Sequence, residues 1–282
     1  MDIQTVGILG AGQMGSGIAQ VCAIAGIDVI MRDINDAAVQ RGIAAITSNF
    51  DRAVGKGKMD AAQKDAALAR IKGSTDIKAL APADFIIEAA TESLALKQTI
   101  LKEIDVLAKP DAIIATNTSS ISITKLAAAM SRPHQFVGMH FFNPVPVMAL
   151  VEVIRGIQTS DATVAATEAF AKRTGKSPIA VKNAPGFVVN RLLVPMINEA
   201  VFVLQEGLAT AEQIDAGMKL GANHPIGPLA LADLIGLDTC LAVMEVFYRD
   251  FNDSKYRPAP LLKEMVDAGY LGRKSKKGFY DY

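Results

Sequence analysis

The chain has 282 residues, of which 50% are hydrophobic and 21% are charged, a balance typical of folded globular proteins with a sizeable core. Lys and Arg together number 29, as do Asp and Glu. No net field therefore draws the whole protein to nucleic acid or to an anionic membrane, and we expect neither as a partner. The two cysteines exclude a disulfide framework and fit a reducing compartment.

A strand-like run begins at Ile3, which leaves no room for a signal peptide before it. The most membrane-like stretch covers residues 136–154. It contains His140, Asn143, two prolines and Glu152, which a membrane-spanning helix would not tolerate. We therefore expect a cytoplasmic protein.

The first half of the chain alternates short apolar runs with amphipathic stretches of helical period. Strands are expected at residues 6–9, 29–31, 85–87, 113–115 and 136–139, and helices at 14–25, 37–54 and 94–108. This alternation predicts an α/β fold with a parallel, doubly wound sheet. The charged stretch at about 51–70 contains two glycines and predicts an inserted helical hairpin that projects from the sheet.

The second half changes character after Asn183-Ala184-Pro185-Gly186. Before it, strands at 150–154 and 179–181 bracket a helix at 162–173; after it, only helices are expected, at 188–206, 211–220, 229–247 and 261–268. The Pro-Gly pair predicts a boundary between a sheet domain, 1–184, and a helical domain, 185–282. The broad apolar faces of these helices must be buried, either within that domain or in a dimer interface.

The first strand runs directly into the turn Gly10-Ala11-Gly12-Gln13-Met14-Gly15. Gly10 would allow the tight turn, Gly12 would let the backbone approach a pyrophosphate, and Gly15 would let the next helix pack closely on the sheet. The helix N-terminus offers amide donors to the anion. This Rossmann-type pattern predicts a dinucleotide site.

An acidic residue follows the glycine turn at the end of the second strand. Asp33 ends the second strand, 18 residues after Gly15, near the spacing of a carboxylate that binds the adenine ribose. A carboxylate there would repel a 2′-phosphate, although the neighbouring Arg32 could accommodate one. We predict NAD as the cofactor.

A histidine and a glutamate are the candidate catalytic residues. His140 is one of three histidines and lies at the end of a predicted strand, on the sheet edge where ligands bind. A neutral imidazole suits proton transfer near pH 7. Glu152 interrupts an apolar strand, so it needs a partner, which a His–Glu pair would supply. A structural strand-end histidine is the alternative; His134 and His224 have the pattern of turn residues.

Three segments together resemble the 3-hydroxyacyl-CoA dehydrogenase family: residues 140–152, Thr116-Asn117-Thr118-Ser119-Ser120 and residues 183–191. The resemblance extends from the glycine turn to Gly278-Phe279-Tyr280. It implies a Rossmann-type sheet followed by an all-helical C-terminal domain. It also implies an NAD-dependent enzyme acting on the (S)-3-hydroxyacyl thioester of coenzyme A, a homodimer, and no metal. Overall similarity favours short chains such as 3-hydroxybutyryl-CoA.

The resemblance also implies roles for individual residues. His140 would be the acid/base and Glu152 its partner, while Ser119 and Asn190 would bind the substrate near its 3-oxygen. Positions that would contact NAD, besides the glycine turn with Gln13 and Met14 and besides Asp33, are Glu92, Lys97, Asn117, Asn143 and Lys274. Lys56, in the inserted hairpin, would bind the CoA moiety.

Two other functions compete with this one. A β-hydroxyacid dehydrogenase of the 6-phosphogluconate type would need a catalytic lysine in a Gly-x-x-x-Lys-x-x-Asn pattern, and the segment from Gly186 to Arg191 contains no lysine. A catalytically retired NAD-binding or crystallin-like protein could share the fold. The presence of His140, Glu152, Ser119 and Asn190 argues against it.

Overall fold

The structure is a computed structural model and describes residues 2–282. The chain forms two compact units, one ending at Ala184 and the other spanning Pro185–Tyr282. The first unit carries a sheet and the second is helical, so the predicted fold class is confirmed.

The N-terminal unit is built on an eight-stranded sheet in the order β3-β2-β1-β4-β5-β6-β7-β8. Its strands are β1 (Thr5–Leu9), β2 (Asp28–Arg32), β3 (Ile71–Ser74), β4 (Phe85–Glu88), β5 (Ile113–Thr116), β6 (Phe136–Phe141), β7 (Leu150–Arg155) and β8 (Ser177–Lys182). Its helices are α1 (Gln13–Ile24), α2 (Asp36–Gly55), α3 (Ala61–Ala69), α4 (Leu94–Leu107), α5 (Ile123–Ala127) and α6 (Asp161–Arg173), with 3₁₀ turns at Ile77–Leu80 and Pro133–Gln135.

All neighbouring strands pair in parallel except β6 and β7, which are antiparallel. The prediction of a parallel sheet is wrong at this one pair. Only the loop 142–149 joins the two strands, whereas a parallel connection needs a crossover of about a dozen residues or more. The pair is therefore a hairpin.

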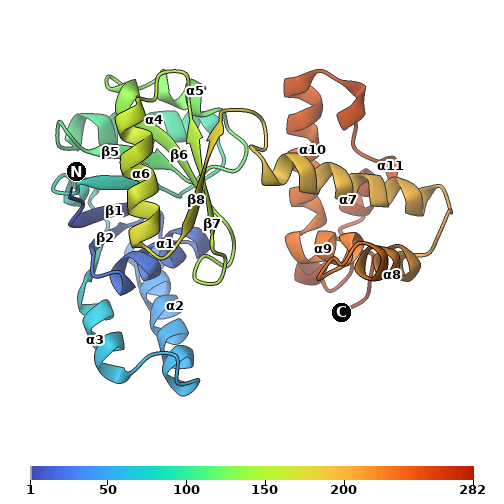
Figure 1. Cartoon of the computed structure of the whole chain (residues 1–282), viewed down its shortest axis with the longest axis horizontal. Helices are drawn as coiled ribbons and strands as arrows, with labels where there is room; N and C mark the ends of the chain where they lie inside the picture. Colours follow the sequence, from blue (N-terminus) through green and yellow to red (C-terminus); the bar gives the residue numbers. More distant parts are fainter. Residues whose placement is uncertain (1) are drawn as a thin grey trace. The chain divides into compact units, whose positions relative to one another are not determined.

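The sheet owes its stability to strands that are buried on both faces. Every residue of β4, β5 and β6 is buried, which explains their continuous apolar runs. Helix α6 crosses one face of the sheet, where the Phe170 ring stacks on Phe85 at 4.7 Å between centroids (Figure 1). Asn117 and His140 lie at the carboxyl ends of two of these buried strands, β5 and β6.

Helices α2 and α3 form a hairpin that extends away from the sheet (Figure 1). Its tip, between Gly55 and Ala61, carries the exposed Lys56. Each arm has its own start signal: the Asn35 side chain accepts from Ala38 N, and Asp60 forms a capping box with Gln63.

The helical unit consists of α7 (Val189–Gln205), α8 (Ala211–Gly221), α9 (Pro228–Ile235), α10 (Leu237–Phe251) and α11 (Pro260–Asp267), with 3₁₀ turns at Ser254–Tyr256 and Arg273–Ser275. The prediction of a single helix at 229–247 is wrong, because this stretch forms two helices, α9 and α10. Gly236 lies between them with φ of 106°, which an α-helix does not allow. Fully buried side chains from three of the helices, Ile197, Leu229 and Leu262, form its core.

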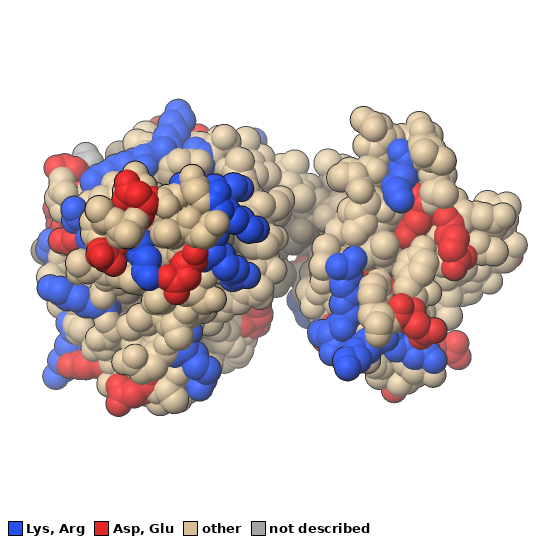
Figure 2. Space-filling view, turned by 90° about the horizontal axis from the view of Figure 1, so that it is seen from below, with Lys and Arg blue, Asp and Glu red and all other residues tan. Residues whose placement is uncertain are grey.

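Among residues 2–282, no helix has the length and apolar character needed to cross a membrane. Acidic and basic side chains are interspersed on the face of the N-terminal unit seen in Figure 2, on the left. Cys22 and Cys240 are both free thiols in the core. Burial raises the pKa of each to about 12, so neither is a nucleophile at neutral pH.

Candidate active site

The three glycines of the motif after β1 are needed for different structural reasons. A Cβ on Gly10, which has φ of 107°, would lie 2.5 Å from the carbonyl oxygen of Ala89, and one on Gly15 would lie 1.8 Å from that of Gly10. Packing therefore requires both. Around Gly12, by contrast, a Cβ would meet nothing within 4 Å. The space beside Gly12 lets a ligand approach the backbone.

Helix α1 begins within this motif, at Gln13. Its N-cap residue is Gly12, which has no side chain to accept hydrogen bonds from the first-turn amides of Gln13 and Met14. An anion beside Gly12 would meet these amides and the positive end of the helix dipole. The turn is thus suited to a pyrophosphate.

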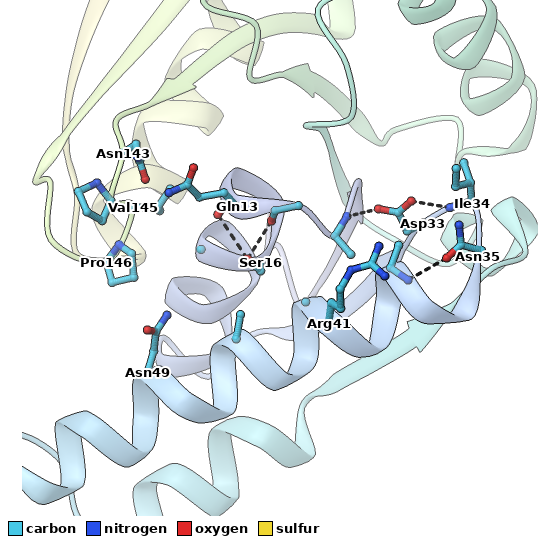
Figure 3. Close-up of a pocket in the computed structure, with 17 residues that line it drawn as sticks. Gln13, Ser16, Asp33, Ile34, Asn35, Arg41, Asn49, Asn143, Val145 and Pro146 are labelled. Carbon is cyan, nitrogen blue, oxygen red and sulfur yellow. Dashed lines mark hydrogen bonds between the residues drawn. The ribbon is translucent and has the colours of Figure 1, made fainter. Parts of the chain in front are cut away.

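A pocket of about 650 Å³ lies beside the turn (Figure 3). At one end Asp33 is held by two backbone amides, since Oδ2 accepts from Ala11 N at 2.7 Å and Oδ1 from Ile34 N at 2.6 Å. Arg41 of α2 lies at the same end. Arg32 is turned to the neighbouring chain segment, where its Nε donates to the Thr75 carbonyl at 3.2 Å. The fixed carboxylate fits a ribose diol better than a ribose phosphate.

The opposite end of the same pocket is lined by Asn143, Pro144, Val145 and Pro146 of the β6–β7 loop (Figure 3). Gln13 and Ser16 lie between the two ends. The glycine turn, Asp33 and Asn143, the residue predicted to lie at the nicotinamide end, therefore line one cavity. Its volume and its donors suit a dinucleotide. Arg41 was not predicted, because a basic residue on an exposed helix face has no distinguishing pattern.

A second, smaller pocket of about 160 Å³ brings together four predicted cofactor residues, Met14, Glu92, Lys97 and Asn117. Asn117 follows β5, and its Oδ1 accepts from Phe141 N at 2.9 Å. This bond ties the carboxyl ends of β5 and β6 together at the edge where ligands bind in such sheets.

Lys97 has a buried partner that the sequence did not reveal. Only 2% of Lys97 is exposed, and its Nζ donates to both carboxylate oxygens of Glu88, at 2.8 and 2.6 Å. Glu88 is fully buried and also accepts from Thr116 Oγ1 at 2.7 Å and Ala90 N at 2.8 Å. Glu88 ends an apolar strand, the signal that pointed to Glu152. The charge of the Lys97 ammonium is therefore balanced by the Glu88 carboxylate within the protein.

Glu92 contacts the predicted substrate serine. Its Oε1 accepts from Ser119 N at 2.9 Å and from Ser119 Oγ at 3.2 Å, while its Oε2 accepts from Thr118 Oγ1 at 2.8 Å. Glu92 thereby fixes the segment after β5. Its carboxylate lies 4.0 Å from Lys97 Nζ, which links the two acidic groups of this region through one cation.

The antiparallel register places His140 of β6 directly opposite Glu152 of β7. Cross-strand partners present their side chains on the same face of the sheet. His140 Nδ1 lies 2.8 Å from Glu152 Oε2, and only 6% of His140 and none of Glu152 is exposed. An ionised carboxylate can only accept a hydrogen bond, so with Glu152 ionised Nδ1 carries the hydrogen and Nε2 the lone pair. The geometry is that of an oriented acid/base pair.

Two predicted residues belong to the helical unit. Asn190 is the second residue of α7, and the next residue, Arg191, stacks on Phe251 with its guanidinium carbon 3.8 Å from the ring centroid. Lys274, in a 3₁₀ turn, donates to Asp238 Oδ2 at 2.6 Å. All other predicted site residues lie in the N-terminal unit. Among them, Lys56 lies on the hairpin tip and lines neither pocket.

A Rossmann-type sheet, a pocket suited to a dinucleotide and an oriented His–Glu pair define a nicotinamide-dependent dehydrogenase. Two family descriptions match the chain: "3-hydroxyacyl-CoA dehydrogenase, NAD binding domain" over residues 5–184, and the C-terminal domain of the same family over residues 186–282. The chain belongs to the 3-hydroxyacyl-CoA dehydrogenase family and is an NAD-dependent enzyme of that family.

Similar proteins cover the chain from end to end. A 3-hydroxybutyryl-CoA dehydrogenase of Bradyrhizobium diazoefficiens is 52% identical over 99% of this chain and 96% of its own. The crystal structure of (S)-3-hydroxybutyryl-CoA dehydrogenase PaaH1 from Ralstonia eutropha has 65% identity and a TM-score of 0.98, covering 100% of this chain and 99% of its own. FadB2 of M. tuberculosis has 44% identity and a TM-score of 0.98, with complete coverage of both chains. The resemblance inferred from the motifs is confirmed.

Proposed function

We propose that the protein interconverts (S)-3-hydroxybutyryl-CoA and acetoacetyl-CoA with NAD as its redox cofactor. The observation that carries this proposal is the buried His140–Glu152 pair, on the strands whose connecting loop lines the dinucleotide pocket. The names of relatives at 52% and 65% identity favour the four-carbon thioester over longer chains.

His140 is the acid/base of the proposed reaction. In oxidation, Nε2 accepts the proton of the 3-hydroxyl group, and in reduction the protonated ring returns it to the 3-oxygen. Glu152 keeps Nδ1 protonated and offsets the positive charge that the ring acquires. NAD, when bound, supplies the hydride chemistry.

Ser119 and Asn190 are the proposed donors to the substrate's 3-oxygen, where negative charge develops as the ketone is reduced. Glu92 holds the Ser119 backbone through its amide, and the one Ser119 hydroxyl proton, which donates to Glu92 here, would turn to the substrate oxygen when substrate binds. Asn117 and Asn143 contact the nicotinamide end of NAD, and Lys274 also contacts the cofactor. Lys56 binds the CoA moiety.

In this proposal residues 1–184 hold the dinucleotide, and residues 185–282 serve substrate binding and dimerisation. A homodimer would cover part of the apolar surface of the helical unit, on which 70% of Leu192, 77% of Leu208 and 87% of Leu220 is accessible in the single chain. Light scattering is expected to give a mass near twice the 29.8 kDa of one chain. A monomer at micromolar concentration would contradict the dimer. We also place the enzyme in the cytoplasm, which cell fractionation would test.

The activity is tested by following NADH absorbance with acetoacetyl-CoA. We expect rapid oxidation of NADH, slower turnover with NADPH because Asp33 lies at the ribose, and lower kcat/KM as the acyl chain lengthens. In the reverse direction, only the (S)-enantiomer of 3-hydroxybutyryl-CoA should reduce NAD. Absence of turnover on every 3-ketoacyl-CoA with both cofactors would contradict the proposal and favour the retired NAD-binding alternative.

A further inference from the structure

The loop 142–149 links the two halves of the site in the N-terminal unit. It leaves β6 directly after His140 and Phe141, and it enters β7 two residues before Glu152. Four of its residues, 143–146, line the dinucleotide pocket. The position of this loop therefore sets one wall of the cofactor pocket and the place of the Asn143 amide.

Backbone bonds and one close apolar contact shape the loop. Val147 N and Met148 N both donate to the Pro144 carbonyl, at 2.9 and 3.0 Å, which closes a turn within it. Val145 is 2% exposed and lies against α1, where a Cβ on Gly17 would come 2.8 Å from its own Cβ. Helix α1 thus supports the loop from the side of the pocket.

Lys176 makes a second set of contacts to the loop. It stands between α6 and β8, and its own backbone is fixed because its N–H donates to the Ala171 carbonyl at 2.9 Å. Only 8% of the residue is exposed. Its Nζ donates to the carbonyls of Val145 and Met148, the latter at 2.9 Å, so one ammonium group bridges the turn inside the loop.

Lys176 is an unfavourable residue to bury at this place. Burial lowers the pKa of its ammonium from the usual range, because the charge loses hydration and both acceptors are neutral carbonyls. An apolar side chain of similar volume would fill the space without that cost. What it would not supply is a pair of charge-assisted hydrogen bonds to the loop backbone, which are stronger and more directional than neutral ones.

We infer that Lys176 is a positioning residue for cofactor binding, acting by fixing the 142–149 loop so that Asn143 and the pocket wall meet the dinucleotide. It does not touch the reacting atoms. The inference rests on the proposed use of Asn143 at the nicotinamide end of the cofactor.

The test compares Lys176→Met with Lys172→Met, which removes an exposed lysine from the end of α6. NADH binding is measured by its fluorescence, without turnover, and Tm is measured beside it. We expect Lys176→Met to weaken NADH binding about tenfold, the equivalent of one charge-assisted hydrogen bond. Lys172→Met should bind NADH like the native protein. Unchanged NADH affinity in Lys176→Met, with only a lower Tm, would overturn the inference.

A double-mutant cycle with Asn143→Ala tests the route through the loop. If Lys176 acts by placing Asn143, the two substitutions together weaken NADH binding less than the product of their separate effects. A fully multiplicative loss would contradict that route. Should Lys176→Met not fold, Lys176→Gln keeps a neutral amide donor, and its NADH affinity should fall between the native and Asn143→Ala values. A native protein that fails to bind NADH would instead contradict the proposed function itself.

Discussion

Replacing His140 with alanine is expected to lower kcat for acetoacetyl-CoA reduction by about 10²–10⁴-fold, the contribution of a positioned general acid. Removal of the ring leaves the substrate oxygen without its proton donor, while the dinucleotide pocket is lined by other residues. The KM for NADH should therefore change little. Steady-state kinetics at saturating NADH measures both values.

Glu152→Gln should lower kcat by a smaller factor, about 10–10²-fold, because the amide oxygen can still accept from Nδ1 but carries no charge to offset that of the ring. His134→Ala is the matched control, since His134 is exposed in a 3₁₀ turn. It should retain native activity. If His140→Ala kept more than a tenth of native kcat, the acid/base would have to be another group.

Replacing Lys97 with methionine is expected to cost about 3–5 kcal/mol of unfolding free energy, the penalty for breaking a buried ion pair from one side. Glu88 would then keep its hydrogen bonds from Thr116 and Ala90 but lose the cation that neutralises it. Urea unfolding followed by circular dichroism gives the value. Lys102→Met, an exposed lysine on the same helix, should change it by less than about 0.5 kcal/mol.

The double variant Lys97→Met/Glu88→Gln separates the charge from the packing. Removing the carboxylate's charge as well should recover most of the lost stability, because a buried ion pair has little net benefit over neutral groups. A single Lys97→Met that costs under about 1 kcal/mol would show that Glu88 finds other compensation. NADH affinity measured on the double variant would then report what the Lys97–Glu88 pair contributes to the cofactor site.

The sequence predicts best where one physical requirement decides the residue. Gly10 and Gly15 are required by backbone approaches that no side chain permits, so their spacing, with the strand before them and Asp33 after them, identifies the turn. Glu152 is a carboxylate in an apolar strand, and its need for a partner pointed to His140, which lies 2.8 Å away across the hairpin. Glu88 carries the same signal, but its partner Lys97 lies on a helix, where no strand register indicates the pairing.

Other features lacked such a local signal. Strand β3 reads Ile-Lys-Gly-Ser, with two exposed residues at the sheet edge, so no apolar run marks it. The break at Gly236 falls inside a continuous apolar pattern, and only the φ of the glycine separates the helices. Lys176 resembles any lysine that follows a helix-ending glycine. Its partners are backbone carbonyls of a distant loop, which side-chain patterns do not encode.

The β6–β7 hairpin has a consequence for how the chain acquires its chemistry. His140 and Glu152 are only 12 positions apart, so their contact closes a short loop at small entropic cost. By contrast, β1 must find β4 across most of the N-terminal half of the chain, as Val6 pairs with Phe85. Local contacts of this kind form readily, whereas distant parallel pairing is slow. The acid/base pair is thus encoded in one contiguous stretch of chain and can assemble before the sheet around it is complete.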